Sequence, residues 1–191
     1  MIKKFSKSLV DILIKNNAID SNLMEVYVYG YEVMISAISD LLITIIIGAI
    51  AGRLINAIIF FMIFVTVRVY TGGYHANTYI KCKFVFISIL ICVLSLSVFY
   101  FDIFTLFFID LFFVMIVFLT APTENENKPL SEDEKRKYSV ISRIISLFWS
   151  AFALLIFSYN STLTVTIIST ELFIGLLLAY GKVKEVTQGE R

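Results

Sequence analysis

The feature that most limits what this chain can fold into is a series of long apolar stretches separated by short polar segments. A helix needs about 20 mostly apolar residues to cross the roughly 30 Å hydrocarbon core of a bilayer. Because lipid offers the backbone no hydrogen-bond partners, such segments are expected to be helical. We therefore predict an all-α, polytopic integral membrane bundle of about six transmembrane helices, at residues 26–51, 54–70, 84–101, 103–121, 141–158 and 162–180.

The composition agrees with this class and excludes an ordinary soluble domain. Hydrophobic residues make up 59% of the chain and charged residues 16%, with a mean hydropathy of +0.87. Soluble domains are nearer 45–50% apolar and about 25% charged. With 191 residues and two prolines, the chain shows no linker or repeat, so residues 1–191 are expected to form a single membrane domain.

The first 25 residues are expected to lie on the membrane surface. A helix through this segment would place apolar side chains on one face and lysines mostly elsewhere, which is typical of a helix in the headgroup region. The apolar residues are Phe5, Leu9, Ile12 and Leu13, and the basic ones are Lys3, Lys4, Lys7 and Lys15.

The basic residues predict the orientation of the chain in the cell membrane. Of the 16 lysines and arginines, all but Arg53 fall in the N-terminal segment, the second loop, the fourth loop (residues 122–140) and the C-terminal tail, with the flanks of those loops. Segments rich in lysine and arginine stay in the cytoplasm. Both termini and these two loops are therefore expected to be cytoplasmic.

The chemistry of the chain concentrates in residues 68–83. This segment holds His75, the only histidine, and Cys82, which lies between Lys81 and Lys83. Neighbouring positive charge favours a thiolate, the nucleophilic form of cysteine. The other cysteine, Cys92, lies in an apolar stretch that disfavours ionisation, so Cys82 is the reactive candidate. A disulfide between them is not expected on the reducing cytoplasmic side.

The spacing of His75 and Cys82 requires a turn in the backbone. In one unbroken helix, residues seven apart are about 10 Å apart along the axis, whereas a Cys–His pair must meet at about 3 Å. Gly72-Gly73 supplies the freedom for a turn. Since irregular backbone at membrane depth must be buried in protein or line a wet cavity, we expect a re-entrant or interfacial segment.

From the residues alone, ordinary interpretations stay open. A single histidine at a membrane interface is commonly an anchor, and an isolated cysteine commonly behaves as a small hydrophobe. One histidine and two cysteines do not supply a usual zinc shell, so no metal site is expected. In the fourth loop, Ser131 and Glu134 form a capping-box pattern that predicts the start of a helix.

Two motifs together resemble the accessory gene regulator B (AgrB) family. One is Arg68-x-x-x-Gly72-Gly73-x-His75-Ala76 followed by Cys82, and the other is Ala121-Pro122, Asn127-Lys128-Pro129-Leu130 and the run from Ser131 to Lys137. The resemblance implies a membrane-embedded cysteine endopeptidase that processes a quorum-sensing propeptide. It makes Cys82 the nucleophile and His75 its base, and it makes Arg68 and Gly73 required parts of the site. Gly72 belongs to the same motif, and Lys135, Arg136 and Lys137 match the family's basic stretch.

The resemblance also implies the outcome of the reaction and the partners. Cys82 would form a thioester with the propeptide, which a cysteine or serine of the peptide could close into a thiolactone or lactone. The expected partners are this propeptide, membrane lipids and a second copy of the chain; nucleic acid and cofactors are not expected.

Four carboxyl groups interrupt the apolar spans, namely Glu32, Asp40, Asp110 and Glu171. Such groups usually face the bundle interior or water. Glu32 is predicted to pair with Arg68 and to position the catalytic segment, while the other three are left without a role. These acids also keep two alternatives open: a transporter or permease-like protein for a peptide or ion, and a non-catalytic membrane scaffold.

Overall fold

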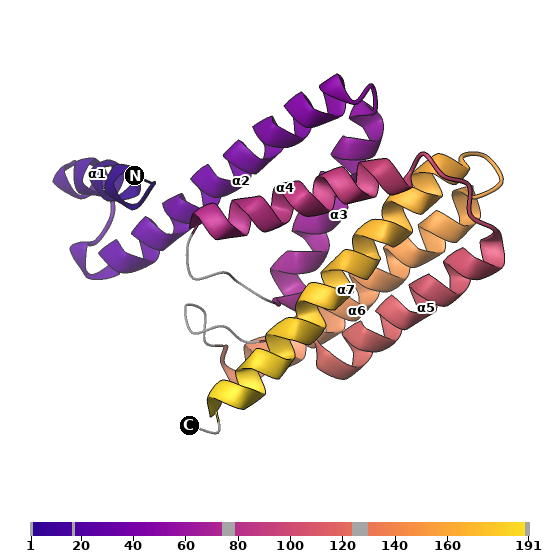
Figure 1. Cartoon of the computed structure of the whole chain (residues 1–191). Coiled ribbons are helices and arrows are strands. Elements are labelled where there is room, and N and C mark those ends of the chain that lie inside the picture. Colours follow the sequence, from indigo (N-terminus) through magenta and orange to yellow (C-terminus); the bar gives the residue numbers. More distant parts are fainter. Residues whose placement is uncertain (1, 17, 74–78, 124–129, 190–191) are drawn as a thin grey trace. The chain divides into compact units, whose positions relative to one another are not determined.

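A computed structural model describes residues 2–16, 18–73, 79–123 and 130–189 of the chain. It divides into two compact units, residues 1–43 and 44–191, and each is described by itself. Helices dominate the described residues of both units (Figure 1). The prediction of an all-α membrane bundle is therefore confirmed.

The first unit contains the predicted amphipathic helix. Helix α1 covers Ile2–Lys15, and its apolar residues Phe5 and Ile12 are exposed, as expected for a helix that lies against a membrane surface. A short 3-10 helix, η1 (Ser21–Leu23), follows, and the Asp20 side chain accepts a hydrogen bond from the Asn22 backbone N–H (2.9 Å). Helix α2 (Met24–Ile50) begins in this unit and ends in the second.

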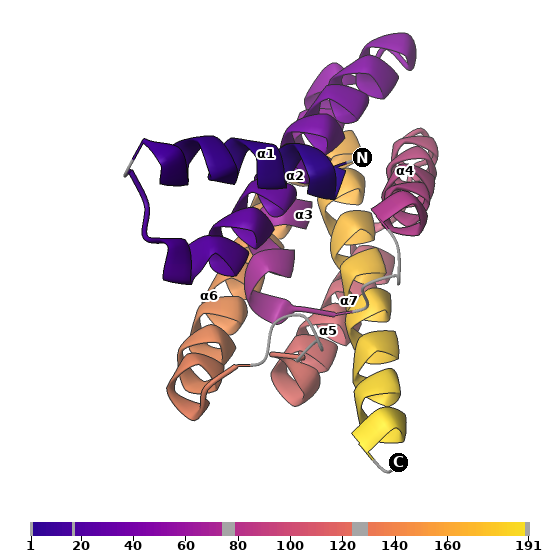
Figure 2. The same cartoon turned by 90° about the vertical axis from the view of Figure 1, so that its left-hand side faces the viewer.

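The second unit is a helical bundle arranged around its last helix. Besides the end of α2, its helices are α3 (Leu54–Thr71), α4 (Tyr79–Leu96), α5 (Ile103–Thr120), α6 (Glu132–Ile156) and α7 (Ser161–Gly189), the last one. Helix α7 packs against α3, α4, α5 and α6. It is therefore the element against which the rest of this unit is assembled (Figures 1 and 2).

Apolar packing in this unit forms two clusters. The larger one joins α3, α5, α6 and α7 through buried side chains such as Ile63, Phe113 and Ile167. The smaller one joins α4 to α3 through Phe60, Phe86 and their neighbours, with residues of α7 at its edge. Since apolar burial gains little in lipid, close packing and interhelical hydrogen bonds hold such helices together.

Polar contacts add specific links between helices of the bundle. The Asn56 amide of α3 donates a hydrogen bond to the Thr166 hydroxyl of α7 (2.7 Å), in a buried position. The Trp149 indole of α6 donates to the Thr66 hydroxyl of α3 (3.2 Å). These hydrogen bonds fix the helix pairs α3–α7 and α3–α6 in register.

The helix ends follow the chain's capping residues. Ser131 caps α6 with the predicted capping box, in which its hydroxyl accepts from the Glu134 N–H and the Glu134 side chain accepts from the Ser131 N–H. Asp102 caps α5 and accepts from the Thr105 N–H (3.0 Å). The capping-box prediction is therefore confirmed.

Five helices among the described residues are long and apolar enough to cross a membrane, and they begin at Ser21, Leu54, Ile103, Glu132 and Ser161. They correspond to five of the six predicted spans. The remaining span, predicted at 84–101, corresponds to α4, which begins at Tyr79 and ends at Leu96. The observed helix starts before the predicted span, because the prediction counted apolar residues and so left out the first turns, which contain Lys81 and Lys83.

Candidate functional site

The candidate site lies at one end of the second unit's bundle. The C-terminal ends of α3, α5 and α7 and the N-terminal end of α6 all lie toward this end of the unit, as Figures 1 and 2 both show. The start of α4 follows the end of α3 in the chain. Among the described residues, this end carries basic side chains of three helices, namely Arg68 of α3, Lys135, Arg136 and Lys137 of α6, and Lys182 and Lys184 of α7.

Helix α3 ends at two glycines whose backbone conformations favour glycine. Gly72 has φ +71° and Gly73 has φ +116°, and the Gly72 N–H donates to the Arg68 carbonyl (3.1 Å). Gly72 forms a parallel bridge with Thr123, whose N–H donates to the Thr71 carbonyl (2.9 Å). A Cβ at position 72 would collide with the Thr123 carbonyl oxygen.

Gly73 is placed against α7. It is buried, and a Cβ built on it would lie 3.4 Å from the Leu177 carbonyl oxygen and 3.4 Å from the Leu178 backbone N. The chain therefore leaves α3 in close contact with the backbone of α7. Glycine suits this position for two reasons, its positive φ and the small space beside it.

Cys82 lies in the first turns of α4, on the side that faces the bundle. Residues four and seven positions later share its helix face, and these are Phe86 and Ile89, which are buried in the smaller apolar cluster. Helical side chains also point toward the N-terminus of their helix. The partly buried Cys82 thiol therefore lies on the face of α4 that packs in the smaller apolar cluster, near the start of this helix.

The second cysteine occupies a different environment. Cys92 is exposed, and it lies between the apolar residues Ile91 and Val93 in the second half of α4. For a helix that crosses lipid, an exposed position in this stretch faces hydrocarbon rather than water. The two thiols therefore differ in exposure and in their place along α4, while the reactivity of Cys82 stays a prediction.

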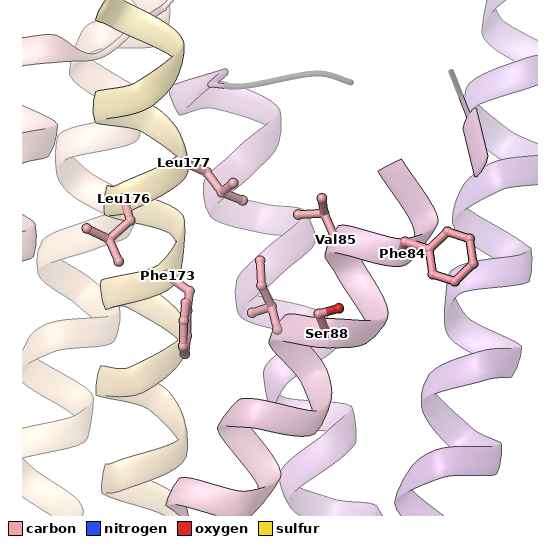
Figure 3. A pocket seen from close by; sticks show the side chains of 7 residues that line it. Phe84, Val85, Ser88, Phe173, Leu176 and Leu177 are labelled. Atoms are coloured by element: carbon pink, nitrogen blue, oxygen red, sulfur yellow. The ribbon is translucent and has the colours of Figure 1, made fainter. Parts of the chain in front are cut away.

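An apolar groove begins one turn after Cys82, between α4 and α7 (Figure 3). It has a volume of about 360 Å³ and is lined by Phe84, Val85, Ser88, Ile89, Phe173, Leu176 and Leu177. Leu177 also presents its carbonyl oxygen to Gly73. A single residue of α7 thus lies beside both the end of α3 and the groove.

The basic stretch of α6 is linked to the end of α3. Arg136 and Lys137 are exposed in the first turns of α6, and Lys135 pairs with Glu132 at 2.8 Å. The Tyr70 ring of α3 meets the Tyr138 ring edge to face, with centroids 5.6 Å apart. This contact places the three basic residues next to the glycine turn.

Two further predicted site residues have known positions. Arg68 lies in the last turn of α3, with its guanidinium carbon 5.2 Å from the centre of the Phe64 ring. Glu32 lies on α2 within the first unit, whereas Arg68 belongs to the second. The pairing of Glu32 with Arg68 therefore stays a prediction.

The histidine of the predicted pair, His75, lies outside the described residues, as do residues 74–78 in general. The geometry of the Cys82–His75 pair and the re-entrant path of the segment stay predictions. Of the segment 68–83, the described parts are the end of α3, the glycine turn and the start of α4.

The sequence did not identify Thr123, Tyr138 or Leu177 as partners of the site. Thr123 follows Ala121-Pro122, a pair that belongs to the family motif. Its bridge to Gly72 gives that motif a structural role, since it joins the end of α5 to the end of α3. Tyr138 directly follows the basic stretch, but nothing in its spacing indicates a partner in α3.

The fold and the site together define a multi-pass, all-α membrane protein with a partly buried cysteine, Cys82, in the first turns of α4. A family model for accessory gene regulator B matches residues 6–178. The chain therefore belongs to the AgrB family, and it takes part in the processing of a quorum-sensing peptide.

Several curated relatives agree with this membership. The chain is 26% identical over 184 residues to "Putative AgrB-like protein 1" of Clostridium perfringens (strain 13 / Type A), covering 96% of this chain and 98% of the relative. It is 28% identical over 173 residues to "Putative AgrB-like protein 2" of the same strain, covering 84% and 80%. No solved structure matches the chain.

Proposed function

We propose that this protein is a membrane-embedded cysteine endopeptidase that cleaves an autoinducer propeptide near its C-terminus and supports closure of the product into a thiolactone or lactone. Cys82 is the nucleophile and His75 is its general base. Arg68, Gly72 and Gly73 shape the site, and Lys135, Arg136 and Lys137 bind acidic residues of the propeptide.

The observation that carries this proposal is the position of Cys82. Its helix face continues into the buried residues Phe86 and Ile89, so the thiol points into the bundle rather than toward lipid. The neighbouring lysines, Lys81 and Lys83, add positive charge beside Cys82 in the sequence. Cys92, which faces outward between apolar residues, has neither advantage.

The chemistry proceeds in two steps. His75 accepts the proton of Cys82, the sulfur attacks a peptide carbonyl, and the C–N bond breaks as the leaving amine takes up that proton from His75. The tetrahedral oxyanion needs hydrogen-bond donors, for which the Arg68 guanidinium and the backbone N–H groups at Gly72-Gly73 are candidates. The product is a thioester on Cys82 and a released C-terminal fragment.

Ring closure follows by exchange at the same carbonyl. A cysteine or serine of the bound peptide attacks the thioester, a new C–S or C–O bond forms, and the Cys82 thiol leaves with a proton. When a thiol of the peptide replaces Cys82, one thioester becomes another and the acyl group stays activated. Thiolactone formation therefore needs no ATP at this step. Water must be kept from the acyl-enzyme, and the apolar groove that begins one turn after Cys82 supports such a dry environment.

The end of the second unit's bundle that carries the basic start of α6 and the lysines near the end of α7 is proposed to face the cytoplasm, and so is the N-terminal segment. Their lysines and arginines fit the positive-inside rule. The propeptide would therefore be captured on the cytoplasmic side of the cell membrane. The protein is further proposed to work as a homodimer, as the family does.

Cysteine substitution tests the proposal directly. The chain is expressed together with a candidate propeptide, and cleavage is followed by mass spectrometry. Cys82→Ala should abolish cleavage, because it removes the sulfur that is proposed to form the thioester. Cys92→Ala is the matched control and should keep cleavage within about twofold of the natural chain, since surface changes usually alter little.

A trapped intermediate gives a second test. With the natural chain, acid quenching should recover a covalent adduct of the peptide's N-terminal fragment on the protein, and hydroxylamine should release it as expected for a thioester. Equal cleavage by Cys82→Ala and Cys92→Ala, or an adduct that maps to another residue, would contradict the assignment of Cys82.

A further inference from the structure

Three helices of the second unit bring polar side chains together in the bundle core, away from the candidate site. Asp110 of α5 is 4% exposed, Ser150 of α6 is 5% exposed and Glu171 of α7 is fully buried. The same cluster of helices is packed with apolar side chains, among them Phe113 and Ile174, one turn from the two acids on their own helices. The acids are therefore enclosed by hydrocarbon.

The contacts among these groups leave oxygen atoms without partners. The Ser150 hydroxyl donates to Glu171 Oε1 at 3.5 Å, and the Asp110 and Glu171 carboxyl groups are close enough to interact electrostatically. Asp110 Oδ1 and Glu171 Oε2 are buried and have no hydrogen-bond partner. The Ser146 hydroxyl, fully buried one turn before Ser150 on α6, has none either.

Two carboxylates cannot both stay ionised in this position without a positive charge. An unpaired charge in an apolar environment is very costly, and adjacent like charges add to the cost. Within the described residues, the groups acting on the pair are the two acids themselves and Ser150, and no lysine or arginine is among them. The compensating charge must therefore come from something that binds there.

We propose that Asp110 and Glu171, with the Ser150 hydroxyl, form a buried binding site for a monovalent cation, either a proton shared by the carboxyls or a sodium ion. Ca²⁺ takes about 6–8 oxygen ligands, more than the two unpartnered carboxyl oxygens and the one unpartnered serine hydroxyl of this cluster. A proton needs one oxygen from each acid. Sodium, another hard cation, would use the unpartnered oxygens, Asp110 Oδ1 and Glu171 Oε2.

The serines of α6 offer a route to this site. Ser142, Ser146 and Ser150 are spaced four residues apart, lie on one helix face and are all buried. They form a line of hydroxyl groups from the first half of α6 toward the acid pair. Buried acids in spanning helices commonly mark ion or proton sites, and this site is separate from the reaction at Cys82.

Infrared spectroscopy and thermal unfolding of the purified full-length chain distinguish the two cations. Spectra are recorded at neutral pH in sodium chloride and in choline chloride of equal ionic strength. A shared proton gives a protonated-carboxyl carbonyl band in both salts, which each single variant, Glu171→Gln or Asp110→Asn, shifts in frequency and the double variant removes. Bound sodium instead raises the unfolding midpoint by at least ~2 °C over choline, an effect on the order of 1 kcal/mol for a chain of this size.

The controls keep the result tied to these residues. Asp40→Asn, which changes another acid of an apolar span, should leave the band and the sodium shift in place. If a variant does not fold, carbon-13 labelling of aspartate or glutamate in the natural chain assigns the band to the residue type by its isotope shift. Absence of both the carboxyl band and a sodium-specific shift in the natural chain would overturn the proposal.

Discussion

Gly72, at the end of α3, forms a parallel bridge with Thr123, three residues after the end of α5. The bridge is tight, because the Thr123 carbonyl oxygen occupies the space into which a Cβ of residue 72 would project. The Thr123 N–H also donates to the Thr71 carbonyl at 2.9 Å. The glycine motif of the second loop and the Ala-Pro motif that precedes the fourth loop thus meet in one structural feature.

The tight bridge predicts that Gly72→Ala is more damaging than an alanine at another glycine of similar backbone angle. Gly52 is the matched control, since it has φ +65° but nothing within 4 Å of its built Cβ. Gly52→Ala should lower the free energy of unfolding by about 1–2 kcal/mol, which is the cost of a positive φ for alanine. Gly72→Ala should lower the free energy of unfolding by about 1–3 kcal/mol more, because the new Cβ would collide with a backbone atom, the Thr123 carbonyl oxygen.

Thermal unfolding of the purified variants measures this difference. For a chain of this size, 1 kcal/mol shifts the unfolding midpoint by about 2–4 °C, so the two variants should differ by several degrees. Gly72→Ala should also lower cleavage, whereas Gly52→Ala should not. Equal midpoints for the two variants would show that position 72 is not sterically closed.

The ring contact between Tyr70 and Tyr138 predicts a coupling between the site and the basic stretch. The rings meet at 87° with centroids 5.6 Å apart, and such pairs contribute about 0.5–1.5 kcal/mol beyond their burial. Tyr70→Phe keeps the ring and should keep stability and cleavage. Tyr70→Leu removes the ring and should lower the unfolding midpoint.

A cleavage assay distinguishes the effect of Tyr70 on the position of α6 from its effect on the stability of the fold. At a temperature where both variants are folded, Tyr70→Leu should raise the KM for the propeptide, because the start of α6 is no longer held against the end of α3. If Tyr70→Phe were as impaired as Tyr70→Leu, the tyrosine hydroxyl and not the ring contact would be responsible.

The fold could be predicted because a bilayer leaves few choices. A run of about 20 apolar residues in lipid must be a helix, and five of the six predicted spans coincide with long apolar helices. The same pattern predicted the start of α4 at residue 84, whereas the helix begins at Tyr79. Lys81 and Lys83 lower the apolarity of residues 79–83, but a helix end that leaves the hydrocarbon tolerates lysines, whose side chains reach toward water.

The candidate site was only partly predictable, for a related reason. Cys82 could be chosen over Cys92 because the two thiols differ in their neighbours along the chain, and neighbouring charge acts over short distances. The contacts of Gly72 with Thr123 and of Gly73 with Leu177 join residues far apart in the sequence. They depend on how α5 and α7 pack against α3, and side-chain periodicity carries no information on that packing.

Asp102 predicts a pH dependence of stability at the start of α5. The Thr105 hydroxyl and backbone N–H donate to its carboxylate (2.5 and 3.0 Å), and these hydrogen bonds hold the pKa of Asp102 below its ordinary value of 3.8. A lowered folded-state pKa gives stability that is present above the unfolded pKa and is lost as the pH falls through the folded pKa. The unfolding midpoint should therefore fall as the pH drops below about 4.

Asp102→Asn isolates this contribution. Asparagine also caps helices but does not titrate, so the difference in midpoint between the natural chain and the variant should shrink as the pH falls from 5 toward 3. The measurement is thermal unfolding across that range in a detergent without titratable groups. A difference that stays constant with pH would mean that the Asp102 carboxylate does not contribute.

The basic stretch of α6 predicts that charge, not shape, captures the propeptide. Arg136 and Lys137 are exposed, and Lys135 is paired with Glu132. Replacing all three with glutamine should raise the KM for cleavage roughly tenfold with little change in kcat, since an exposed ion pair contributes about 0.2–1 kcal/mol and 1.4 kcal/mol is a factor of ten. The matched control is Lys182→Gln with Lys184→Gln, which removes basic charge at the same end of the bundle but from α7.

Salt and topology complete this test. For the natural chain the KM should rise with ionic strength, because salt screens exposed charges, whereas the triple variant should show a weaker salt dependence. Insertion is checked by labelling a cysteine placed in the C-terminal tail from either side of the membrane, in the Cys92→Ala background. Normal insertion with an unchanged KM would mean that the three residues bind lipid headgroups and not the peptide, because a topological role needs no contact with the substrate.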